Sequence, residues 1–270
     1  MLTETISRLD DYARLLHGFS TRLGGVSQPP HASLNLAFSR PDDPAAVLEN
    51  RRRFTAALGF SLDNVVIAGQ VHGTTVRVVA GADRGRGAYG IANVLPPADA
   101  LITNTPDVVL WAGFGDCTPL LFFDPVQHAV GVAHAGWRGT VDNIADAVVA
   151  AMHQHFASDP ANLVVVIGPA IGPCCYEVGT EVISAATAAF GVATAAELLL
   201  RPPGNDRPHF DLWSANAFWL EQAGVDAHNI IQTELCTACN VDRFFSHRRE
   251  SGQTGRFAAV IGLCSPGEGR

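Results

Sequence analysis

Short apolar runs separated by turn-forming residues constrain the fold of this chain more than any other feature of its sequence. The runs are rich in Val, Ile and Phe, and each is bounded by Gly, Pro or Asp, a pattern typical of buried β-strands. We expect strands at residues 64–68, 75–79, 108–112, 120–123, 129–133, 163–167, 230–235 and 257–263.

Helical patterns lie between these runs. We expect helices at residues 44–58, 142–156, 181–190 and 213–223, and we expect Gly191 and Gly224 to end the last two. The alternation predicts an α/β fold with mixed α+β character, in which one layered domain spans residues 1–270 around a mixed β-sheet. Two segments that contain Gly and Pro, 84–97 and 201–209, are predicted to be surface loops within that domain.

The composition indicates a globular protein and disfavours several partners. Hydrophobic residues make up 47% of the 270 residues, which is enough for a large core. The net charge of -8 gives no Coulomb assistance in binding nucleic acid or an anionic membrane, so we expect neither partner. No run approaches the roughly 20 apolar residues that span a bilayer. The six cysteines are irregularly spaced, and we expect a cytoplasmic protein with reduced thiols.

Three segments share one design, in which an apolar strand leads into a polar turn that carries a metal-binding side chain. They are VVIAGQVHG with His72, VVLWAGFGDC with Cys117, and VGVAHAGWRG with His134. Two imidazoles and a thiolate suit zinc, and three protein ligands leave one tetrahedral position open, as catalytic zinc sites do. Such an ion lowers the pKa of its bound water to about 7.

Cys117 also has two other interpretations. A thiolate beside Asp116, with His134 brought close by the fold, would form a nucleophilic dyad. A buried cysteine is more often an inert core residue. Residue types alone do not separate these alternatives from a zinc site.

Arginines beside turns predict an anion site. Arg22 precedes a Gly-Gly turn, Arg248 and Arg249 follow an apolar stretch, and Arg138 lies four residues beyond His134 at a predicted helix start. Arginines and backbone N–H groups at such positions bind anions, most often phosphate. Surface salt bridges are the alternative for each arginine, and Arg138 fits that alternative least because it lies near a predicted ligand.

Two further motifs are interpreted as mostly structural. Cys236 and Cys239 have the spacing of a zinc knuckle or a redox pair, but no second C-x-x-C partners them, because Cys174 and Cys175 are adjacent. An H-x-H motif at residues 153–155 lies on a predicted helix, where its imidazoles would point to opposite sides.

Taken together, the motifs resemble those of one known family. The chain is similar from about residue 17 to 263 to the YfiH/YlmD family, which includes the laccase domain-containing protein FAMIN. The matching strings are HGFSTRLGGVS, SLNLAF, QVHG, ADALITN, GDCTPLLFFDP, VGVAHAGWRGT, IGPAIGPCCYEVG, FDLWSANAFWLEQAGV and CTACNVDRFFSHRRESGQTGRFAAVIGL.

The resemblance implies a fold, a metal and an activity. The family's unusual α/β fold, the YfiH-like fold, has been likened to that of cytotoxic necrotizing factor. Its QVHG, GDC and AHAGWRG motifs place zinc ligands at His72, Cys117 and His134. The implied activity is purine nucleoside phosphorylase on adenosine, inosine and methylthioadenosine, together with adenosine deamination. The implied partners are these nucleosides and phosphate, and we expect a monomer or a weak homodimer.

Roles for individual residues follow from the resemblance. Cys117, Arg138 and Arg248 are the expected catalytic residues, and Arg22, Asn35 and Arg248 are expected to bind substrate. The phosphate clamp would draw on Arg22, Arg138 and Arg248.

The general acid is left open among Asp99, Asp116 and Glu177, each of which would serve equally well as a capping or supporting residue. The signature of cytidine-type zinc deaminases is absent, so any deaminase here is of another type.

Two rival functions remain at this stage. A cysteine hydrolase or amidase would use Cys117 against a peptidoglycan precursor, with His134 or His72 as base. A copper-dependent phenol oxidase would carry Cu²⁺ in place of Zn²⁺ at the same ligands, as the Irving–Williams order permits. A trinuclear copper cluster is disfavoured because the chain has one H-x-H motif among ten histidines.

Overall fold

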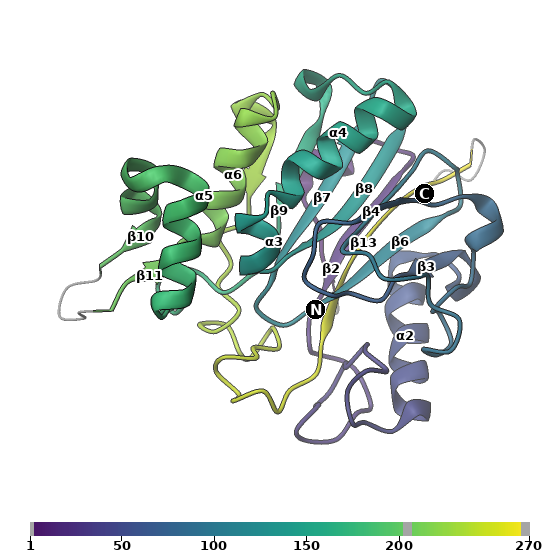
Figure 1. Ribbon diagram of the computed structural model, residues 1–270. Coiled ribbons are helices and arrows are strands. Elements are labelled where there is room, and N and C mark those ends of the chain that lie inside the picture. The colour runs from purple at the N-terminus through teal and green to yellow at the C-terminus, as the bar shows by residue number, and fades with distance from the viewer. Residues whose placement is uncertain (1–2, 202–206, 266–270) are drawn as a thin grey trace.

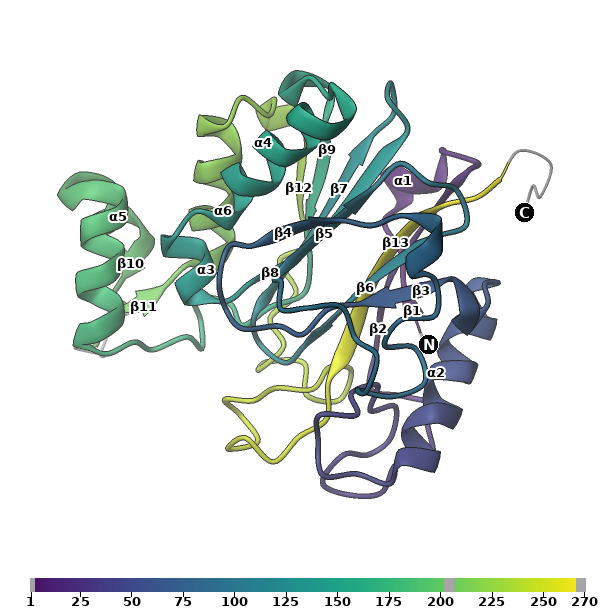
Figure 2. The same ribbon diagram turned by 45° about the vertical axis from the view of Figure 1, so that its right-hand side comes forward.

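The computed structural model describes residues 3–201 and 207–265, and within them two mixed β-sheets pack face to face between helices (Figures 1 and 2). The first sheet has the order β1 (Thr3–Glu4), β2 (Leu15–Ser20), β13 (Phe257–Leu263), β6 (Val109–Phe114) and β3 (Val65–Ile67). The second has the order β12 (Ile230–Gln232), β9 (Val164–Ile167), β7 (Thr118–Asp124), β8 (Ala129–Ala135), β5 (Ala100–Thr103) and β4 (Val76–Val78).

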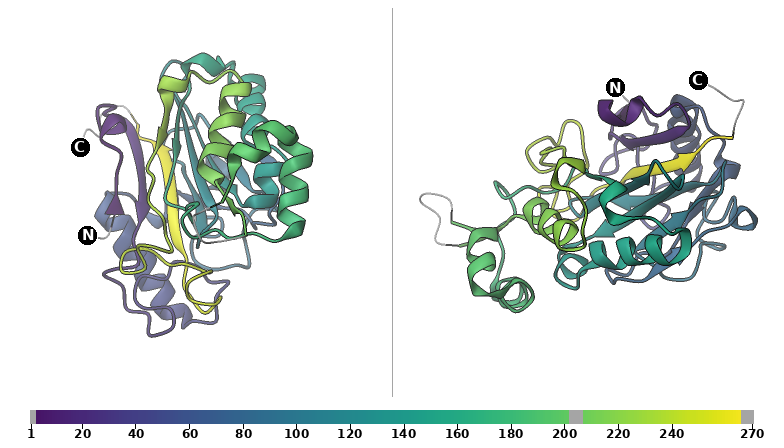
Figure 3. Two further views of the ribbon diagram at one scale, coloured as in Figure 1. Left: turned by 90° about the vertical axis from the view of Figure 1, so that its left-hand side faces the viewer. Right: turned by 90° about the horizontal axis from the view of Figure 1, so that it is seen from above.

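Helices cover the outer faces of both sheets, as an edge-on view shows (Figure 3). The α-helices are α1 (Ser7–Asp10), α2 (Pro44–Leu58), α3 (Trp137–Val141), α4 (Ile144–Phe156), α5 (Thr180–Leu198) and α6 (Leu212–Gln222). Short 3₁₀ turns lie at Leu62–Asn64, Gly81–Asp83, Pro160–Asn162 and Ala227–Asn229, and β10 (Leu199–Leu200) pairs with β11 (His209–Phe210). The expected mixed α/β class is confirmed, with its strands divided between two sheets.

The layering explains why the central strands are apolar throughout. Along β7, Leu121 and Phe123 face the core between the two sheets. Leu120 and Phe122 face the core beneath α4 and α6. Both faces of the strand are buried, so its sequence shows a continuous apolar run instead of the alternation of a half-exposed strand.

The helix α2 has capping residues at both of its ends. Asp43 accepts a hydrogen bond from the N–H of Ala45, Pro44 occupies the first turn, and Gly59 ends the helix with a left-handed φ of 74°. Its inner side packs on the outer face of the first sheet, where Phe54 meets Trp111 edge-to-face at 5.3 Å.

The strands and helices expected from the sequence all form, with shifted ends. Seven further strands and α-helices of the described residues were not expected: β1, α1, β2, β5, α3, β10 and β11. The β2 strand is buried along its whole length, but His17 and Gly18 interrupt its apolar run. The segment 230–235 forms a strand only over Ile230–Gln232.

The expected end of a helix at Gly191 is confirmed, although a second helix follows it directly within α5. Gly191 kinks α5 (φ 76°, ψ 162°), and helical structure continues to Leu198. By length and composition α5 is the one helix of the described residues that could cross a membrane, which differs from the expectation that no run is long enough. The kink leaves each straight part shorter than the roughly 20 residues that a membrane span requires.

The two predicted loops have different outcomes. The segment 84–97 is more than a surface excursion: the N–H of Ile67 donates to the carbonyl of Arg86, and the N–H of Leu95 donates to the carbonyl of Ile67, both at 2.9 Å. Within it Ala88 is fully buried. Of the loop 201–209, residues 202–206 lie outside the described residues.

Close approach of the two sheets depends on Gly168, which follows β9. A Cβ built at Gly168 would lie 2.4 Å from the ring of Phe19 on β2 of the other sheet. We therefore expect Gly168→Ala to lower the free energy of unfolding by about 1–3 kcal/mol, as overpacking does. Urea denaturation measures the change, and Gly90→Ala is the control because nothing lies within 4 Å of the added Cβ. Equal stability of the two variants would contradict this account of sheet packing.

Candidate active site

The fold brings three predicted ligands together at the junction of the two sheets. His72 lies in the turn after β3, Cys117 lies between β6 of the first sheet and β7 of the second, and His134 is on β8. The β7–β8 register pairs His134 with Pro119, which places its imidazole beside Cys117. The ligand atoms all lie within 4.8 Å of one another.

Asp99 supports two of these ligands at once. Its Oδ1 lies 2.8 Å from Nδ1 of His134, so Nε2 is the ring nitrogen left for the cluster. Its two carboxylate oxygens also accept the backbone N–H groups of Val71, His72 and Gly73 at 3.1, 2.9 and 2.7 Å. Burial alone raises the pKa of Asp99, but these hydrogen bonds outweigh it and hold the pKa below its usual value, so the carboxylate stays ionised.

The pKa of the Cys117 thiol is lowered, which favours its ionised form. Burial raises its pKa, but the charge of His134 and hydrogen bonds from both imidazoles lower it to about 6. Burial in turn lowers the pKa of His134, while the Cys117 thiolate and the Asp99 carboxylate raise it to about 9. A thiolate between two imidazoles is the donor set that zinc or copper takes.

Gly136 keeps space open over this cluster. A Cβ at this position would lie 3.0 Å from Cδ2 of His72 and 3.2 Å from Sγ of Cys117. The residues present therefore fit a metal ion in donor type and in available space, and the ion would displace the proton that His134 shares with Cys117.

A cavity of about 530 Å³ opens beside the cluster, within the range typical of small-molecule sites. Its lining residues are Ala37, Ser39, Gln70, His72, Gly113, Gly115, Asp116, Cys117, His134, Trp137, Arg138, Ile171, Tyr176, Leu212, His247, Arg248 and Arg256. Three guanidinium groups and one carboxylate line this cavity, so its charge suits an anion.

The arginines of the cavity are held in different ways. Arg138 stacks on Trp137 with 4.1 Å to the ring centroid and pairs with Glu181 at 2.9 Å. Arg248 donates from Nη1 to the carbonyl of Glu177 at 2.9 Å and lies over the ring of Tyr176. Both retain N–H groups that are not used in these contacts.

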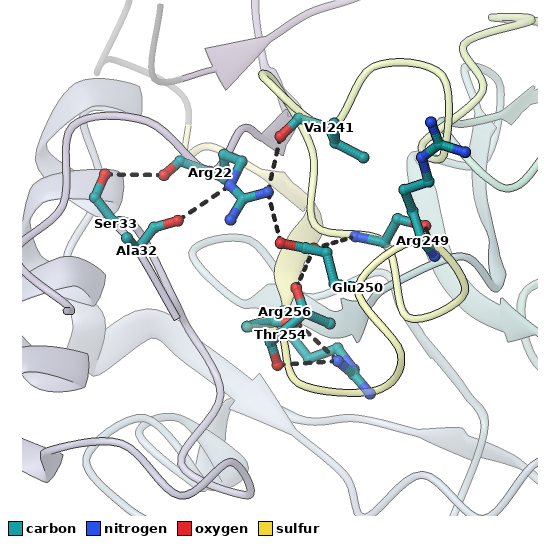
Figure 4. Close-up of polar contacts among 10 residues, drawn as sticks. Arg22, Ala32, Ser33, Val241, Arg249, Glu250, Thr254 and Arg256 are labelled. Carbon is teal, nitrogen blue, oxygen red and sulfur yellow. Dashed lines mark hydrogen bonds and ion pairs between the residues drawn. The ribbon is translucent and has the colours of Figure 1, made fainter. Parts of the chain in front are cut away.

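Arg22 does not line the cavity, contrary to its predicted role as a substrate clamp. Its guanidinium donates to the carbonyls of Ala32 at 3.0 Å and Val241 at 2.8 Å, and it pairs with Glu250 at 3.0 Å (Figure 4). It also lies 4.6 Å from the centroid of the Phe245 ring. These contacts occupy its charge within the protein, so Arg22 fastens loops together and does not face a substrate.

Asn35 is likewise absent from the cavity lining, contrary to its predicted role in substrate binding. It is fully buried. Its Oδ1 accepts the N–H of Arg256 at 3.0 Å, and its Nδ2 donates to Asp42 at 2.8 Å. Asn35 therefore contacts two lining residues, because its Oδ1 also accepts the N–H of Ala37 at 3.2 Å. Arg256 is a lining arginine that the sequence analysis did not single out, although it lies in the matched TGR string.

Among the three candidates for the general acid, one lines the cavity. Asp116 accepts hydrogen bonds from the Thr237 hydroxyl and from the N–H of Arg248, both at 2.6 Å. Asp99 is committed to the histidine cluster. Glu177 pairs with Arg207 at 2.7 Å.

His247 also lines the cavity, and the sequence analysis did not single it out. Burial, followed by the charge of Arg256, lowers the pKa of His247, so its imidazole is neutral at pH 7.

Comparisons with known proteins agree with this geometry. A family model described as "Multi-copper polyphenol oxidoreductase laccase" matches residues 16–264. The chain is 40% identical over 251 residues to "Purine nucleoside phosphorylase YlmD" of Geobacillus stearothermophilus, covering 93% of this chain and 91% of that protein. It is 34% identical over 250 residues to "Adenosine deaminase RL5" of an unknown prokaryotic organism, covering 91% and 94%.

A solved structure extends the likeness to three dimensions. The crystal structure of the Bacillus licheniformis hypothetical protein YfiH matches with a TM-score of 0.91 and 36% identity, covering 97% of this chain and 96% of that one. Likeness in sequence and in fold therefore extends over nearly the whole chain, and the chain belongs to the YfiH/YlmD family.

Proposed function

We propose that this chain is a zinc-dependent purine nucleoside phosphorylase that acts on adenosine, inosine and methylthioadenosine and also deaminates adenosine. The observation that carries the proposal is the cationic cavity directly beside the cluster of His72, Cys117 and His134. The names of the relatives, one a phosphorylase and one a deaminase, support the same two activities.

His72, Cys117 and His134 would hold the metal through two imidazole nitrogens and one thiolate. When bound, a zinc ion supplies Lewis-acid chemistry and an activated water. The ligands come from both sheets, which supports treating residues 1–270 as one catalytic domain. The cytoplasmic location and the monomer or weak homodimer stay predictions.

Arg138 and Arg248 would bind and orient phosphate, with Arg256 beside them. Phosphorolysis joins phosphate to C1′ of the sugar and breaks the bond from C1′ to the base, so the phosphate must be held against that carbon. Guanidinium groups suit the task because they give two parallel hydrogen bonds to phosphate oxygens.

The remaining walls of the cavity suit a purine nucleoside. Trp137 and Tyr176 offer aromatic faces, and Ile171 and Leu212 add apolar surface against which a base can pack. The neutral imidazole of His247 can give or accept a hydrogen bond at the substrate.

A cysteine hydrolase is the second candidate, and one observation favours it. In the absence of metal the lowered pKa of Cys117 and the raised pKa of His134 describe a thiolate–imidazolium pair, the resting state of a nucleophilic cysteine. A phenol oxidase with a trinuclear copper cluster is less well supported. Neither metal-binding group found among the described residues contains more than two histidines.

Removal of the metal separates the two candidates. We expect chelation, or Cys117→Ser, to reduce phosphate-dependent release of hypoxanthine from inosine by more than about 100-fold. Loss of a residue that only supports a metal ligand already costs about 10- to 100-fold in metal affinity or activity. Chromatography of the released base measures the rate, and metal content is quantified in the same samples. Cys264→Ser is the matched control, because Cys264 belongs to neither metal-binding group. A full rate in metal-free protein would exclude the phosphorylase proposal.

Replacing Arg138 tests the phosphate clamp. We expect Arg138→Ala to raise KM for phosphate by about 10- to 100-fold, the range for a lost charge-assisted hydrogen bond. Stability should hardly change, because the ion pair of Arg138 with Glu181 is exposed.

Arg22→Ala provides the contrast for Arg138→Ala. Arg22 pairs with Glu250 inside the protein, so we expect its loss to lower the free energy of unfolding by about 1–3 kcal/mol and to leave KM for phosphate unchanged. A raised KM in Arg22→Ala with normal stability would restore Arg22 to the substrate site.

Alkylation of the chelated protein tests the charge state of Cys117. Only the thiolate reacts, and its pKa of about 6 means that the iodoacetamide rate rises through a midpoint near pH 6, well below that of an ordinary thiol. Peptide mass spectrometry measures the rate at Cys117 between pH 4.5 and about 10. His134→Gln removes the imidazolium and should move the midpoint upward. An unchanged midpoint in that variant would show that His134 does not set the pKa.

A further inference from the structure

Four cysteines outside the candidate active site meet at one place. The sulfur atoms of Cys174, Cys175, Cys236 and Cys239 all lie within 4.8 Å of one another. Sγ of Cys239 is 3.5 Å from Sγ of Cys174 and 3.4 Å from Sγ of Cys175. The C-x-x-C motif therefore does have partners, and they are the adjacent pair.

The sheet topology produces this meeting. The strands β9 and β12 are parallel neighbours, so the segments that follow them leave the same edge of the sheet. Their pairing continues into a bridge between Ala170 and Cys236, with the N–H of Thr237 donating to the carbonyl of Ala170 at 3.0 Å. Each of the two segments then presents two thiols to the other.

The spacing of the sulfur atoms fits a shared metal ion better than a disulfide. Zinc–sulfur bonds of about 2.3 Å in a tetrahedron separate the sulfurs by about 3.8 Å. The separations of Cys239 from Cys175 and Cys174, 3.4 and 3.5 Å, lie below that value, and the 4.8 Å limit of the group lies above it. A disulfide would require about 2.05 Å.

A backbone N–H group faces one sulfur of the four-cysteine group. Cys236 is buried, and its Sγ accepts the backbone N–H of Gly172 at 3.3 Å, a contact that stabilises a thiolate.

Four thiols this close cannot all ionise without a cation among them. Like charges a few ångströms apart repel one another strongly, so each added thiolate is opposed by those already present. A divalent ion removes that opposition.

We infer that Cys174, Cys175, Cys236 and Cys239 bind a zinc ion at a second site, distinct from the cluster at His72. Four thiolates complete the tetrahedron and leave no open position, so this ion is structural and activates no water. A four-sulfur tetrahedron takes zinc or iron among the common metals, and zinc needs no redox partner.

Such an ion would fasten one wall of the candidate active site. Cys175 precedes Tyr176, which lines the cavity. Thr237, between the ligands Cys236 and Cys239, donates its hydroxyl to Asp116 at 2.6 Å, directly beside Cys117. The second site would thus position residues of the cavity without touching the substrate.

Metal stoichiometry tests the inference on protein purified under reducing conditions. We expect two zinc ions per chain in the wild type and one in His72→Ala/His134→Ala, where only the four-cysteine site remains. We expect one in Cys236→Ser/Cys239→Ser and two in the control Cys264→Ser. Circular dichroism checks that each variant is folded. The absence of zinc from folded His72→Ala/His134→Ala overturns the inference, whichever metal the cluster at His72 carries in the wild type. Wild-type protein without zinc overturns it as well, and that result stands even where a variant fails to fold.

Two further measurements identify the ion and its ligands. Cobalt substituted into His72→Ala/His134→Ala should show the intense sulfur-to-cobalt charge-transfer and visible bands of a tetrahedral thiolate site, and these should vanish when Cys236→Ser/Cys239→Ser is added. Thiol titration of the denatured wild type should find all six cysteines reduced. Iron in place of zinc, or a disulfide within the group, would overturn the proposal.

Discussion

The carboxylate of Asp99 accepts hydrogen bonds from three consecutive backbone N–H groups and from His134, and the candidate metal cluster depends on them. His72 has a left-handed φ of 64°, a conformation that costs a residue with a side chain about 1–3 kcal/mol. The hydrogen bonds that reach its own N–H and those of its neighbours offset that cost. One buried charge therefore fixes the turn that carries the first histidine and the ring orientation of the second.

A carboxylate also accompanies strained backbone where the chain crosses from the first sheet to the second. The chain leaves β6 and enters β7 through Gly115, Asp116 and Cys117, and Asp116 has a φ of 90°. Its carboxylate is held by the Thr237 hydroxyl and the N–H of Arg248. Strained backbone thus lies directly beside Cys117, stabilised by contacts from segments more than 100 residues away in sequence. The site requires the complete two-sheet fold, because no local segment contains both the strain and the groups that offset it.

Local patterns predicted the buried strands and offered His72, Cys117 and His134 as candidate ligands, because a strand that ends in a polar turn is visible within about ten residues. The family resemblance then favoured a metal site over the alternatives. Local patterns do not show in which direction a long side chain points. Arg22 beside its Gly-Gly turn resembles an anion clamp, yet its guanidinium faces Ala32, Val241 and Glu250. The four-cysteine group was missed because its halves meet only through the parallel pairing of β9 and β12, a contact that no local spacing encodes.

The positive charge that lines the cavity is costly to the folded protein and favours the binding of an anion. The chain carries a net charge of -8, yet Arg138, Arg248 and Arg256 line the cavity with Asp116 as its one carboxylate. Burial and the nearby charge of Arg40 lower the pKa of Arg256, which shows that its charge is costly where it lies. Asn35 and the carbonyls of Thr254 and Gly255 hold Arg256 there despite that cost. An anion bound among the three guanidinium groups would relieve their repulsion, so the mutual repulsion of these charges favours anion binding.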